Sequence, residues 1–354
     1  MPDRTTLDVL VVADGASVHT RRLLRALSER DMRVELAAFE PAEVPGIVEH
    51  RIGALPPTRD RRYVFGVAAL ARIIRARRPA IVHAHYVSSY GVMAALALRL
   101  ARGPKLVQTA WGTDLLITAR RSRVRRALAA LALRPADLIT GDSLELERES
   151  AALAPGRRWL RFVFGPPAAL FDVGDERDDL IVSMRRLDPD MRVETAVLAF
   201  RRAREIAPAA LAGWGLLVAG DGERADAVRD AADGETAIEL AGRLDHGTLH
   251  RRIAGARVQV SIPTTDTTSA ALLEGLAAGL VPVVSDLPGP REWVDDSIGE
   301  IVPREPSVAD VAGAIVRAVM RDIPRERLRD RVRDVTWERE IDRLVDAYRT
   351  LLPR

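Results

Sequence analysis

Short apolar runs alternate with amphipathic stretches along most of this chain. The run at 7–13 has the length and continuous hydrophobicity of a buried strand, and the segment at 18–30 repeats its apolar residues at helical spacing. The same pattern predicts further strands at 32–38, 80–84, 105–110, 137–140, 180–184, 214–219, 237–240, 258–262 and 281–285. It predicts further helices at 64–77, 87–101, 121–133, 144–153, 193–206, 223–232, 247–254 and 269–278, and over most of 307–352. Strands separated by helices of this length form β-α-β units, so parallel sheets are expected.

The alternation is interrupted by a stretch rich in glycine, proline and charge. Residues 164–179 read FGPPAALFDVGDERDD, which is the composition of a linker. We therefore expect an N-terminal Rossmann-like domain at 1–165, a linker at 166–178, a C-terminal Rossmann-like domain at 179–335, and a final helix at 336–354 that is a candidate for crossing back to the first domain. The predicted fold class is α/β, with two doubly wound domains facing a cleft. In such sheets, ligands bind in the loops beyond the carboxyl ends of the strands.

Composition narrows the chemistry that is available. With 47% hydrophobic residues, the 354-residue chain can bury sizeable cores, and its lack of cysteine excludes disulfides, thiolate nucleophiles and cysteine-ligated metal centres. Among 53 basic residues the single lysine is Lys105, which lies in no glycine-rich loop, so a Schiff-base lysine and a P-loop lysine are nearly excluded. The net charge of +3 is small and gives only a weak argument for a nucleic-acid partner, which we do not expect.

The sequence contains no evident targeting or membrane-spanning segment. The N-terminal residues MPDRTTLDVLVVAD are typical of a strand start rather than of a secretory signal, and no run of about 18 apolar residues occurs. We therefore expect a cytoplasmic protein. Two basic stretches, one from Arg59 to Arg78 and one from Arg120 to Leu133, carry apolar residues between their arginines. They leave two interpretations open: a solvated helix face, or peripheral docking on the anionic inner face of a membrane.

The densest group of candidate functional residues lies at 261–289, SIPTTDTTSAALLEGLAAGLVPVVSDLPG. A buried strand ends at Pro263, a polar turn follows, and an apolar helix then carries one carboxylate, Glu274. Three residues at the start of this helix cap helices well: Thr267, Thr268 and Ser269. The free N–H groups of a helix N-terminus suit a diphosphate, and a carboxylate at Asp266 or Glu274 suits sugar hydroxyls. The alternative is an ordinary capped helix with Glu274 on a solvated face.

These residues resemble the retaining glycosyltransferases of family 4, which have the GT-B fold of two Rossmann-like domains. The signature of that family is an acidic residue, seven residues and then glutamate, and Asp266 and Glu274 match it. The resemblance implies that Asp266 lies by the donor sugar of a UDP- or GDP-sugar and that Glu274 binds the ribose. The family often has glutamate at the first position, so the shorter aspartate is a departure.

Two further segments resemble the donor-binding half of that family. In VSMRRLDPDMRVETAVLAF, the match assigns diphosphate neutralisation to Arg186 and Arg192, the second in place of a lysine. Arg185 takes the first role if the register moves by one residue. In AGRLDHGTLHRRIAGARVQVSIP, the match brings the backbone around Arg243 and Leu244 to the nucleobase. Arginine suits both phosphate positions because its guanidinium can bind phosphate through two parallel hydrogen bonds.

The N-terminal half resembles a subgroup of the same family through IVHAHYVSSYGVMAALALRLARGPKLVQTAWGTDLL and through the loop that contains Gly15. The resemblance assigns four residues to the acceptor side: Gly15, His85, Trp111 and Asp114. Many family members have a histidine where Trp111 stands. His83 and His85 share one strand face, but a metal site needs a third ligand that is not evident there, so no metal site is predicted.

The predicted function is the transfer of a hexose or related sugar, with retention, from a nucleotide-diphospho-sugar to an acceptor hydroxyl on a glycan, a lipid-linked molecule or a small molecule. Asp266, Arg186 and Arg192 are the predicted catalytic residues. Because the arginines would meet the charge that develops on the leaving diphosphate, a metal is not expected to be required and no bound cofactor is expected. Two alternatives stay open: a nucleotide-sugar epimerase of similar fold, and a degenerate protein that binds sugar nucleotides without turnover.

Overall fold

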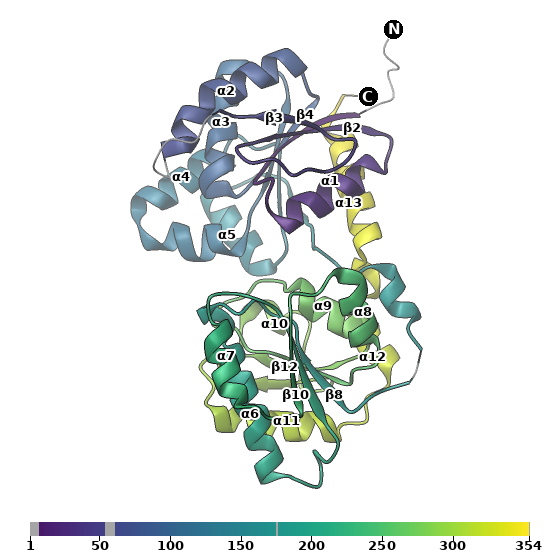
Figure 1. Ribbon diagram of the computed structural model, residues 1–354. Helices are drawn as coiled ribbons and strands as arrows, with labels where there is room; N and C mark the ends of the chain where they lie inside the picture. Colours follow the sequence, from purple (N-terminus) through teal and green to yellow (C-terminus); the bar gives the residue numbers. More distant parts are fainter. Residues whose placement is uncertain (1–6, 54–60, 175, 354) are drawn as a thin grey trace. The chain divides into compact units, whose positions relative to one another are not determined.

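The computed structural model describes residues 7–53, 61–174 and 176–353. The chain divides into two compact units (Figure 1): unit 1 comprises Met1–Phe164 and Glu338–Arg354, and unit 2 comprises Gly165–Trp337. Each unit is a parallel β-sheet covered by helices. The predicted fold class, two doubly wound Rossmann-like domains, is confirmed.

Unit 1 contains a seven-stranded sheet with the strand order β3-β2-β1-β4-β5-β6-β7. Its strands are β1 (Leu7–Val12), β2 (Met32–Ala38), β3 (Val48–Arg51), β4 (Ile81–His85), β5 (Lys105–Thr109), β6 (Leu138–Gly141) and β7 (Trp159–Arg161). All neighbouring strands run parallel. The strand order changes direction between β1 and β4. Ligands of open α/β sheets bind beyond the carboxyl ends of the strands at such a point.

The helices that connect these strands are α1 (Val18–Ser28), α2 (Arg61–Arg77), α3 (Val92–Ala101), α4 (Arg123–Leu133) and α5 (Leu144–Leu153). Ser122 and Ser143 cap α4 and α5, since each side-chain oxygen accepts a hydrogen bond from a backbone amide of the first helical turn. Short turns precede α3 and α4: η1 (Val87–Gly91), η2 (Thr113–Thr118) and η3 (Ala119–Arg121). The uninterrupted α-helix predicted at 87–101 is therefore wrong over its first five residues, which form a π-helical turn.

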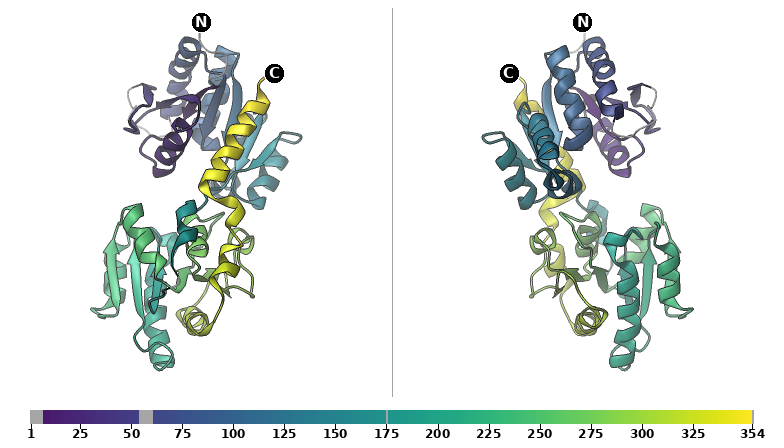
Figure 2. Two further views of the ribbon diagram at one scale, coloured as in Figure 1. Left: turned by 90° about the vertical axis from the view of Figure 1, so that its right-hand side faces the viewer. Right: turned by 90° about the vertical axis from the view of Figure 1, so that its left-hand side faces the viewer.

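The last helix, α13 (Trp337–Leu351), packs in unit 1 (Figure 2). Its Tyr348 is buried, and the Tyr348 hydroxyl lies 2.6 Å from Nδ1 of His83 on β4. Glu340, also buried, accepts a hydrogen bond of 2.8 Å from the backbone amide of Val163. The segment that ends the chain therefore completes the first unit.

Unit 2 contains a six-stranded sheet with the order β10-β9-β8-β11-β12-β13. Its strands are β8 (Leu180–Ser183), β9 (Gly215–Ala219), β10 (Ile238–Gly242), β11 (Val258–Ser261), β12 (Val281–Ser285) and β13 (Glu300–Val302). Its α-helices are α6 (Val193–Ile206), α7 (Ala225–Ala232), α8 (His246–Ala254), α9 (Ala270–Ala277), α10 (Pro288–Arg291), α11 (Val308–Met320) and α12 (Arg325–Arg329). Three one-turn segments complete it: η4 (Ala168–Asp172), η5 (Pro189–Met191) and η6 (Arg333–Val335). The order changes direction between β8 and β11, so the loops after these strands are the expected ligand loops.

Each strand predicted from the sequence is present, and the differences are at the edges of the sheets. The hydrophobic pattern does not predict β3, β7 and β13, each of which has three or four residues and lies at an edge of its sheet. Alternation over so few residues cannot be distinguished from a loop. The sequence of β3, VEHR, also carries the charged residues that are typical of an edge strand.

Candidate active site

In unit 2, one arginine joins the loops that follow β8 and β11. Arg185, just beyond β8, forms an ion pair with Asp266, 3.0 Å between Nη2 and Oδ2, and a hydrogen bond with Oγ of Ser269. The side chains of Arg185 and Asp266 are only 11% and 15% exposed. The Sδ atom of Met191 lies 3.0 Å from Nη2 of the same guanidinium. A mostly buried positive charge is therefore held at the point where the strand order of unit 2 changes direction.

Helix α9 begins at this cluster. Ser269 is its N-cap, and the Ser269 hydroxyl accepts a hydrogen bond of 3.3 Å from the backbone amide of Leu272. The backbone carbonyl of Ser269 accepts from Leu273 at 3.1 Å. Because the dipole of a helix is positive at its N-terminus, the end of α9 and the Arg185 guanidinium reinforce each other as a site for an anion.

The turn before α9 is fixed by a hydrogen bond within the turn and by contacts with the segment at 289–293. Asp266 accepts a hydrogen bond of 3.1 Å from the amide of Thr267, and the Thr268 hydroxyl lies 3.3 Å from the indole nitrogen of Trp293. A Cβ atom at Gly289 would lie 1.8 Å from the carbonyl oxygen of Thr267, so only glycine allows this contact. Ser269 is the predicted cap that heads the helix, whereas Thr267 and Thr268 lie in the turn before it.

The two arginines predicted to bind the diphosphate, Arg186 and Arg192, pair with groups other than Asp266 and Ser269. Arg186 is 79% exposed and pairs with Asp188 at 2.8 Å. Arg192 has left-handed backbone geometry, with φ 52°, at the start of α6, and its Nη1 donates to the carbonyl of Arg304 at 2.7 Å. The position beside Asp266 and α9 belongs to Arg185, the alternative that a shift of register allows. Neighbouring residues at a strand end point in opposite directions, so sequence spacing alone cannot choose between them.

Glu274 lies in the middle of α9 and is buried, with 5% of its surface exposed. The alternative that placed it on a solvated helix face is therefore wrong. Its Oε1 faces Nε2 of His250 on α8 at 3.7 Å, which exceeds hydrogen-bond distance. His250 carries no role in the family resemblance, although its spacing of four residues from His246 is a recognisable signal for a paired histidine site.

The loop between β10 and α8 carries the residues expected at the nucleobase. Arg243 is exposed and Leu244 is half-buried. Asp245 follows them as the N-cap of α8, where its carboxylate accepts a hydrogen bond of 3.0 Å from the amide of Thr248. Gly220, in the loop after β9, has the carbonyl oxygen of Arg185 2.0 Å from where a Cβ atom would be. The loops that follow β8, β9 and β10 are therefore packed or capped at the carboxyl ends of the strands.

In unit 1, Gly15 follows β1 in a tightly packed loop. A Cβ atom at Gly15 would lie 2.1 Å from the carbonyl oxygen of Glu40 and 2.7 Å from the carbonyl carbon of Pro41. Only glycine allows the loop to approach the segment after β2 so closely. This packing accounts for the glycine independently of any ligand.

An aromatic cluster surrounds His85 and Trp111, which lie at the carboxyl ends of β4 and β5. Their ring centroids are 6.0 Å apart, and Tyr86 stacks on Trp111 with a centroid distance of 5.4 Å and an interplanar angle of 16°. Burial, together with the nearby His19, lowers the pKa of His85 to about 3, so the ring is neutral at physiological pH. Nε2 of His85 and Nε1 of Trp111 are buried without a hydrogen-bond partner among the described residues. Such groups can serve a polar ligand atom.

Asp114 and His83 make contacts that tie the strand-end turns together. The Asp114 carboxylate accepts hydrogen bonds from the amide of Val87 at 3.0 Å and the amide of Ser88 at 3.3 Å, and another from the Ser88 hydroxyl. Its burial raises its pKa to about 6. The His83 ring nitrogens lie 2.6 Å from the hydroxyls of Tyr348 and Thr109. Both side chains are therefore already engaged by protein groups.

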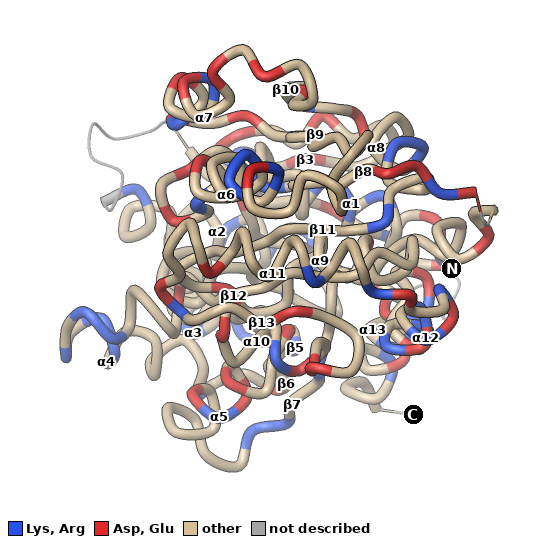
Figure 3. The backbone as a smooth tube through the Cα atoms, turned by 90° about the horizontal axis from the view of Figure 1, so that it is seen from below, with Lys and Arg blue, Asp and Glu red and all other residues tan. Residues whose placement is uncertain are grey.

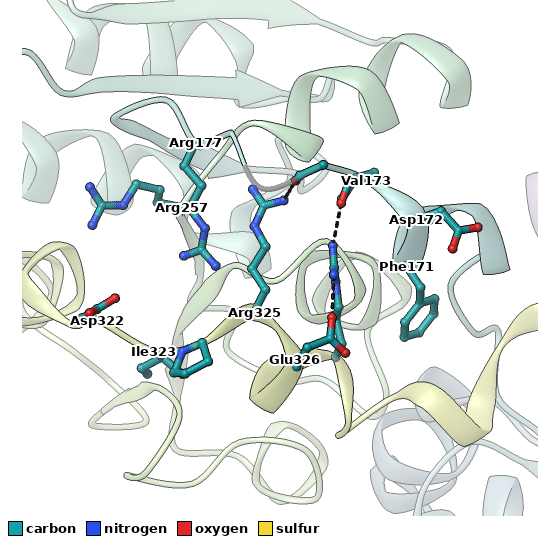
Figure 4. Close-up of a pocket in the computed structure, with 12 residues that line it drawn as sticks. Phe171, Asp172, Val173, Arg177, Arg257, Asp322, Ile323, Arg325 and Glu326 are labelled. Carbon is teal, nitrogen blue, oxygen red and sulfur yellow. Dashed lines mark hydrogen bonds and ion pairs between the residues drawn. The ribbon is translucent and has the colours of Figure 1, made fainter.

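A separate hollow of about 610 Å³ in unit 2 is lined by residues 171–174, Arg177, Arg257, residues 322–326 and Arg329 (Figure 4). Arg325 donates to the carbonyl of Ala254 at 2.9 Å, and Arg329 donates to the carbonyl of Val173 at 2.9 Å. Arg257 immediately precedes β11, so the hollow lies at the amino ends of the strands. Arg325 and Arg329 hydrogen-bond to the chain segments around the hollow. The hollow therefore lies at the amino ends of the strands, whereas Arg185 lies at their carboxyl ends.

Both halves of the chain match known protein families. Residues 8–143 match the family described as "Glycosyl transferase 4-like", and residues 172–335 match the family "Glycosyl transferases group 1". None of the curated proteins matches the chain significantly.

Solved structures share the fold over nearly the whole chain. A sucrose-phosphate synthase from Thermosynechococcus elongatus is 18% identical, with 97% of this chain and 99% of that chain covered and a TM-score of 0.76. The Anabaena protein Alr3699/HepE in complex with UDP is 14% identical, with 98% and 100% covered and a TM-score of 0.76. An α,α-trehalose 6-phosphate synthase from Burkholderia multivorans is 15% identical, with 98% and 97% covered and a TM-score of 0.72. At these identities the likeness establishes the fold, which is the GT-B fold.

Proposed function

Since this chain belongs to the glycosyltransferases, with a 4-like domain followed by a group 1 domain, we propose that it transfers a sugar from a nucleotide-diphospho-sugar to an acceptor hydroxyl with retention of anomeric configuration. The observation that carries the proposal is the cluster of Arg185, Asp266 and Ser269 at the N-terminus of α9. A UDP-sugar is the first donor to test, because the structurally similar Anabaena protein was solved with UDP and with UDP-glucose.

The cluster suits the charge that develops during the reaction. When the anomeric C–O bond breaks, negative charge accumulates on the leaving diphosphate. We assign its stabilisation to the Arg185 guanidinium and to the first amides of α9. The backbone amides of Leu272 and Leu273 donate to the hydroxyl and the carbonyl of Ser269. Within the described contacts, the amides of Ala270 and Ala271 are therefore available to a phosphate oxygen. Donors that are already in place before the reaction usually make the largest contribution to catalysis.

Arg185 also fixes the position of Asp266. Its ion pair holds Asp266 beside the N-terminus of α9, and we assign this carboxylate to the donor sugar. We assign the carboxylate of Glu274 to the ribose. We keep Arg192 as a second diphosphate contact and the backbone at Arg243 and Leu244 as the nucleobase contact. Arg186 leaves this set because it is 79% exposed and pairs with Asp188.

For the reacting hydroxyl, we propose attack on the face from which the phosphate leaves, with a phosphate oxygen taking the proton. Of the four described residues assigned to the acceptor side, His85 and Trp111 each have a buried ring nitrogen without a hydrogen-bond partner, Nε2 and Nε1 respectively. Trp111 also supplies an apolar ring face on which a sugar can stack. We assign Gly15 and Asp114 to support of this region, since both make the packing and hydrogen bonds described above.

The surface of unit 1 suggests where a lipid-linked acceptor would be met. Helix α4 carries a cluster of basic residues (Figure 3). Its Arg123 and Arg125 are exposed, and so are the apolar Val124 (70%) and Leu128 (41%). Within the described residues, none of the helices combines the length and apolarity of a membrane span. We propose that α4 contacts the anionic inner face of a membrane, where apolar and basic side chains both gain. The other basic stretch begins at residues that lie outside those described.

One experiment separates the proposed transfer from its alternatives. The protein is incubated with a panel of sugar nucleotides, with and without acceptor extracts, and released nucleoside diphosphate is measured. Release that depends on acceptor, with the product keeping the anomeric configuration by NMR, supports the proposal. An isomerised donor without release indicates the epimerase, and donor binding without turnover indicates the degenerate protein. Sedimentation with anionic and neutral vesicles tests the membrane contact, which a double change Arg123→Glu and Arg125→Glu should abolish.

A further inference from the structure

Two histidines and a glutamate of unit 2 converge outside the cluster of Arg185. His246 and His250 are four residues apart on α8, so both lie on one face of that helix. Their ring centroids are 5.8 Å apart. That face meets α9 at Glu274, and one ligand atom from each of the three side chains lies within 4.8 Å of the others. Two histidines at this helical spacing together with a carboxylate form a set that binds zinc.

The distances fit a shared cation better than a hydrogen bond. Nε2 of His250 and Oε1 of Glu274 are 3.7 Å apart, too far for a hydrogen bond. Two ligands of a tetrahedral zinc ion, each at about 2.0–2.1 Å from the metal, are separated by about 3.3 Å. A shift of a few tenths of an ångström would therefore bring both atoms to metal-ligand distance.

Burial gives the second, independent observation. Nε2 of His250 is buried and has no hydrogen-bond partner among the described residues, and it faces the carboxylate of Glu274, which is 5% exposed. Burying polar groups that face one another without bonding is costly, and a metal ion would satisfy both. His246 is exposed, so its ring is free to turn toward the ion and complete a three-residue set.

We propose that His246, His250 and Glu274 bind a zinc ion, with a fourth position left to water, and that this ion competes with the sugar-nucleotide donor for Glu274. The zinc site itself stands on the geometry of α8 and α9. Only the competition rests on the proposed function, because it requires that Glu274 bind the donor ribose. Zinc would thus act as an inhibitor and would not be needed for turnover.

Direct metal binding tests the site without reference to activity. Untagged protein is titrated with zinc chloride by calorimetry, and with Co²⁺ to record the visible absorption of a tetrahedral site. We expect one equivalent of zinc to bind, and His250→Asn, His246→Asn and Glu274→Gln each to weaken binding by at least about tenfold. His50→Asn is the matched control, since His50 faces a carboxylate of Glu35 at 2.7 Å in unit 1. Absence of binding, or equal binding by all variants, overturns the proposal.

The competition is measured with UDP as the probe. Zinc should raise the apparent Kd of UDP at least severalfold for the wild-type protein and leave it unchanged for His246→Asn. That variant lacks a metal ligand but keeps Glu274, so it corrects for zinc held by UDP in solution. Zinc that binds without affecting UDP overturns the competition while the site stands. UDP that fails to bind even without zinc contradicts the proposed donor, and the calorimetric result still decides the zinc site.

Discussion

Replacement of Arg185 by alanine should abolish most of the catalytic activity, whereas replacement of the adjacent Arg186 should leave it almost intact. Arg185 is 11% exposed and contacts both Asp266 and the N-cap of α9, so its loss removes a preorganised positive charge from the site of the leaving group. Removing one such donor costs about 10²–10³-fold in kcat, or about 2.7–4 kcal/mol. Arg186 is 79% exposed, and surface ion pairs contribute less than about 1 kcal/mol, which predicts less than about a fivefold change.

The assay is release of nucleoside diphosphate from the donor that the panel identifies, at saturating donor and over a range of donor concentrations. Arg185→Lys keeps the charge but loses the forked geometry, so an intermediate rate is expected. Thermal unfolding of each variant shows whether it is folded, because Arg185→Ala leaves the mostly buried Asp266 without its cation. Normal turnover by folded Arg185→Ala, or collapse of turnover in Arg186→Ala, would refute the assignment.

Three further changes test the structural basis of the two sites. Gly289→Ala places a Cβ atom 1.8 Å from the carbonyl oxygen of Thr267. It should lower the free energy of unfolding by about 1–3 kcal/mol, measured by denaturant, and weaken donor binding, measured by UDP titration. Unchanged values for both would contradict the packing argument. Asp114→Ala removes the acceptor for the amides of Val87 and Ser88 and should cost about 1–3 kcal/mol, visible as a lower Tm. His85 has a folded-state pKa of about 3 against an ordinary value of 6.5, so the unfolded chain binds more protons between these values and stability falls as the pH drops below about 6.5. His85→Phe should reduce this loss, by up to about 1.4 kcal/mol per pH unit, when unfolding is compared at about pH 7 and about pH 5; an identical pH dependence would show that His85 does not cause it.

The hydrophobic pattern predicts most of the architecture because buried parallel strands and amphipathic helices have different periods over segments long enough to show them. It does not predict β3, β7 and β13, whose few residues lie at sheet edges. It also does not show that the turn after β4 is π-helical, since this turn depends on the Asp114 carboxylate, which lies 26 and 27 residues further along the chain.

For the candidate site too, some features can be predicted from local spacing and others cannot. The acidic pair of Asp266 and Glu274 and the helix cap at Ser269 are recognisable from local spacing. The choice of Arg185 over Arg186 is not, because a one-residue step at a strand end reverses the direction of the side chain. The convergence of His250 with Glu274 joins two helices, and no spacing along the chain measures the distance between them.

The sequence alone therefore determined the two α/β domains, the absence of cysteine chemistry and the dependence on arginine for any phosphate charge. These are properties of composition and of local periodicity, which do not depend on how distant segments meet. Only the tertiary structure decided which arginine faces α9, that Glu274 is buried beside His250, and that α13 closes unit 1 through Tyr348 and His83. Each of these is a contact between segments far apart in the chain, and packing selects it from several that the local sequence would permit.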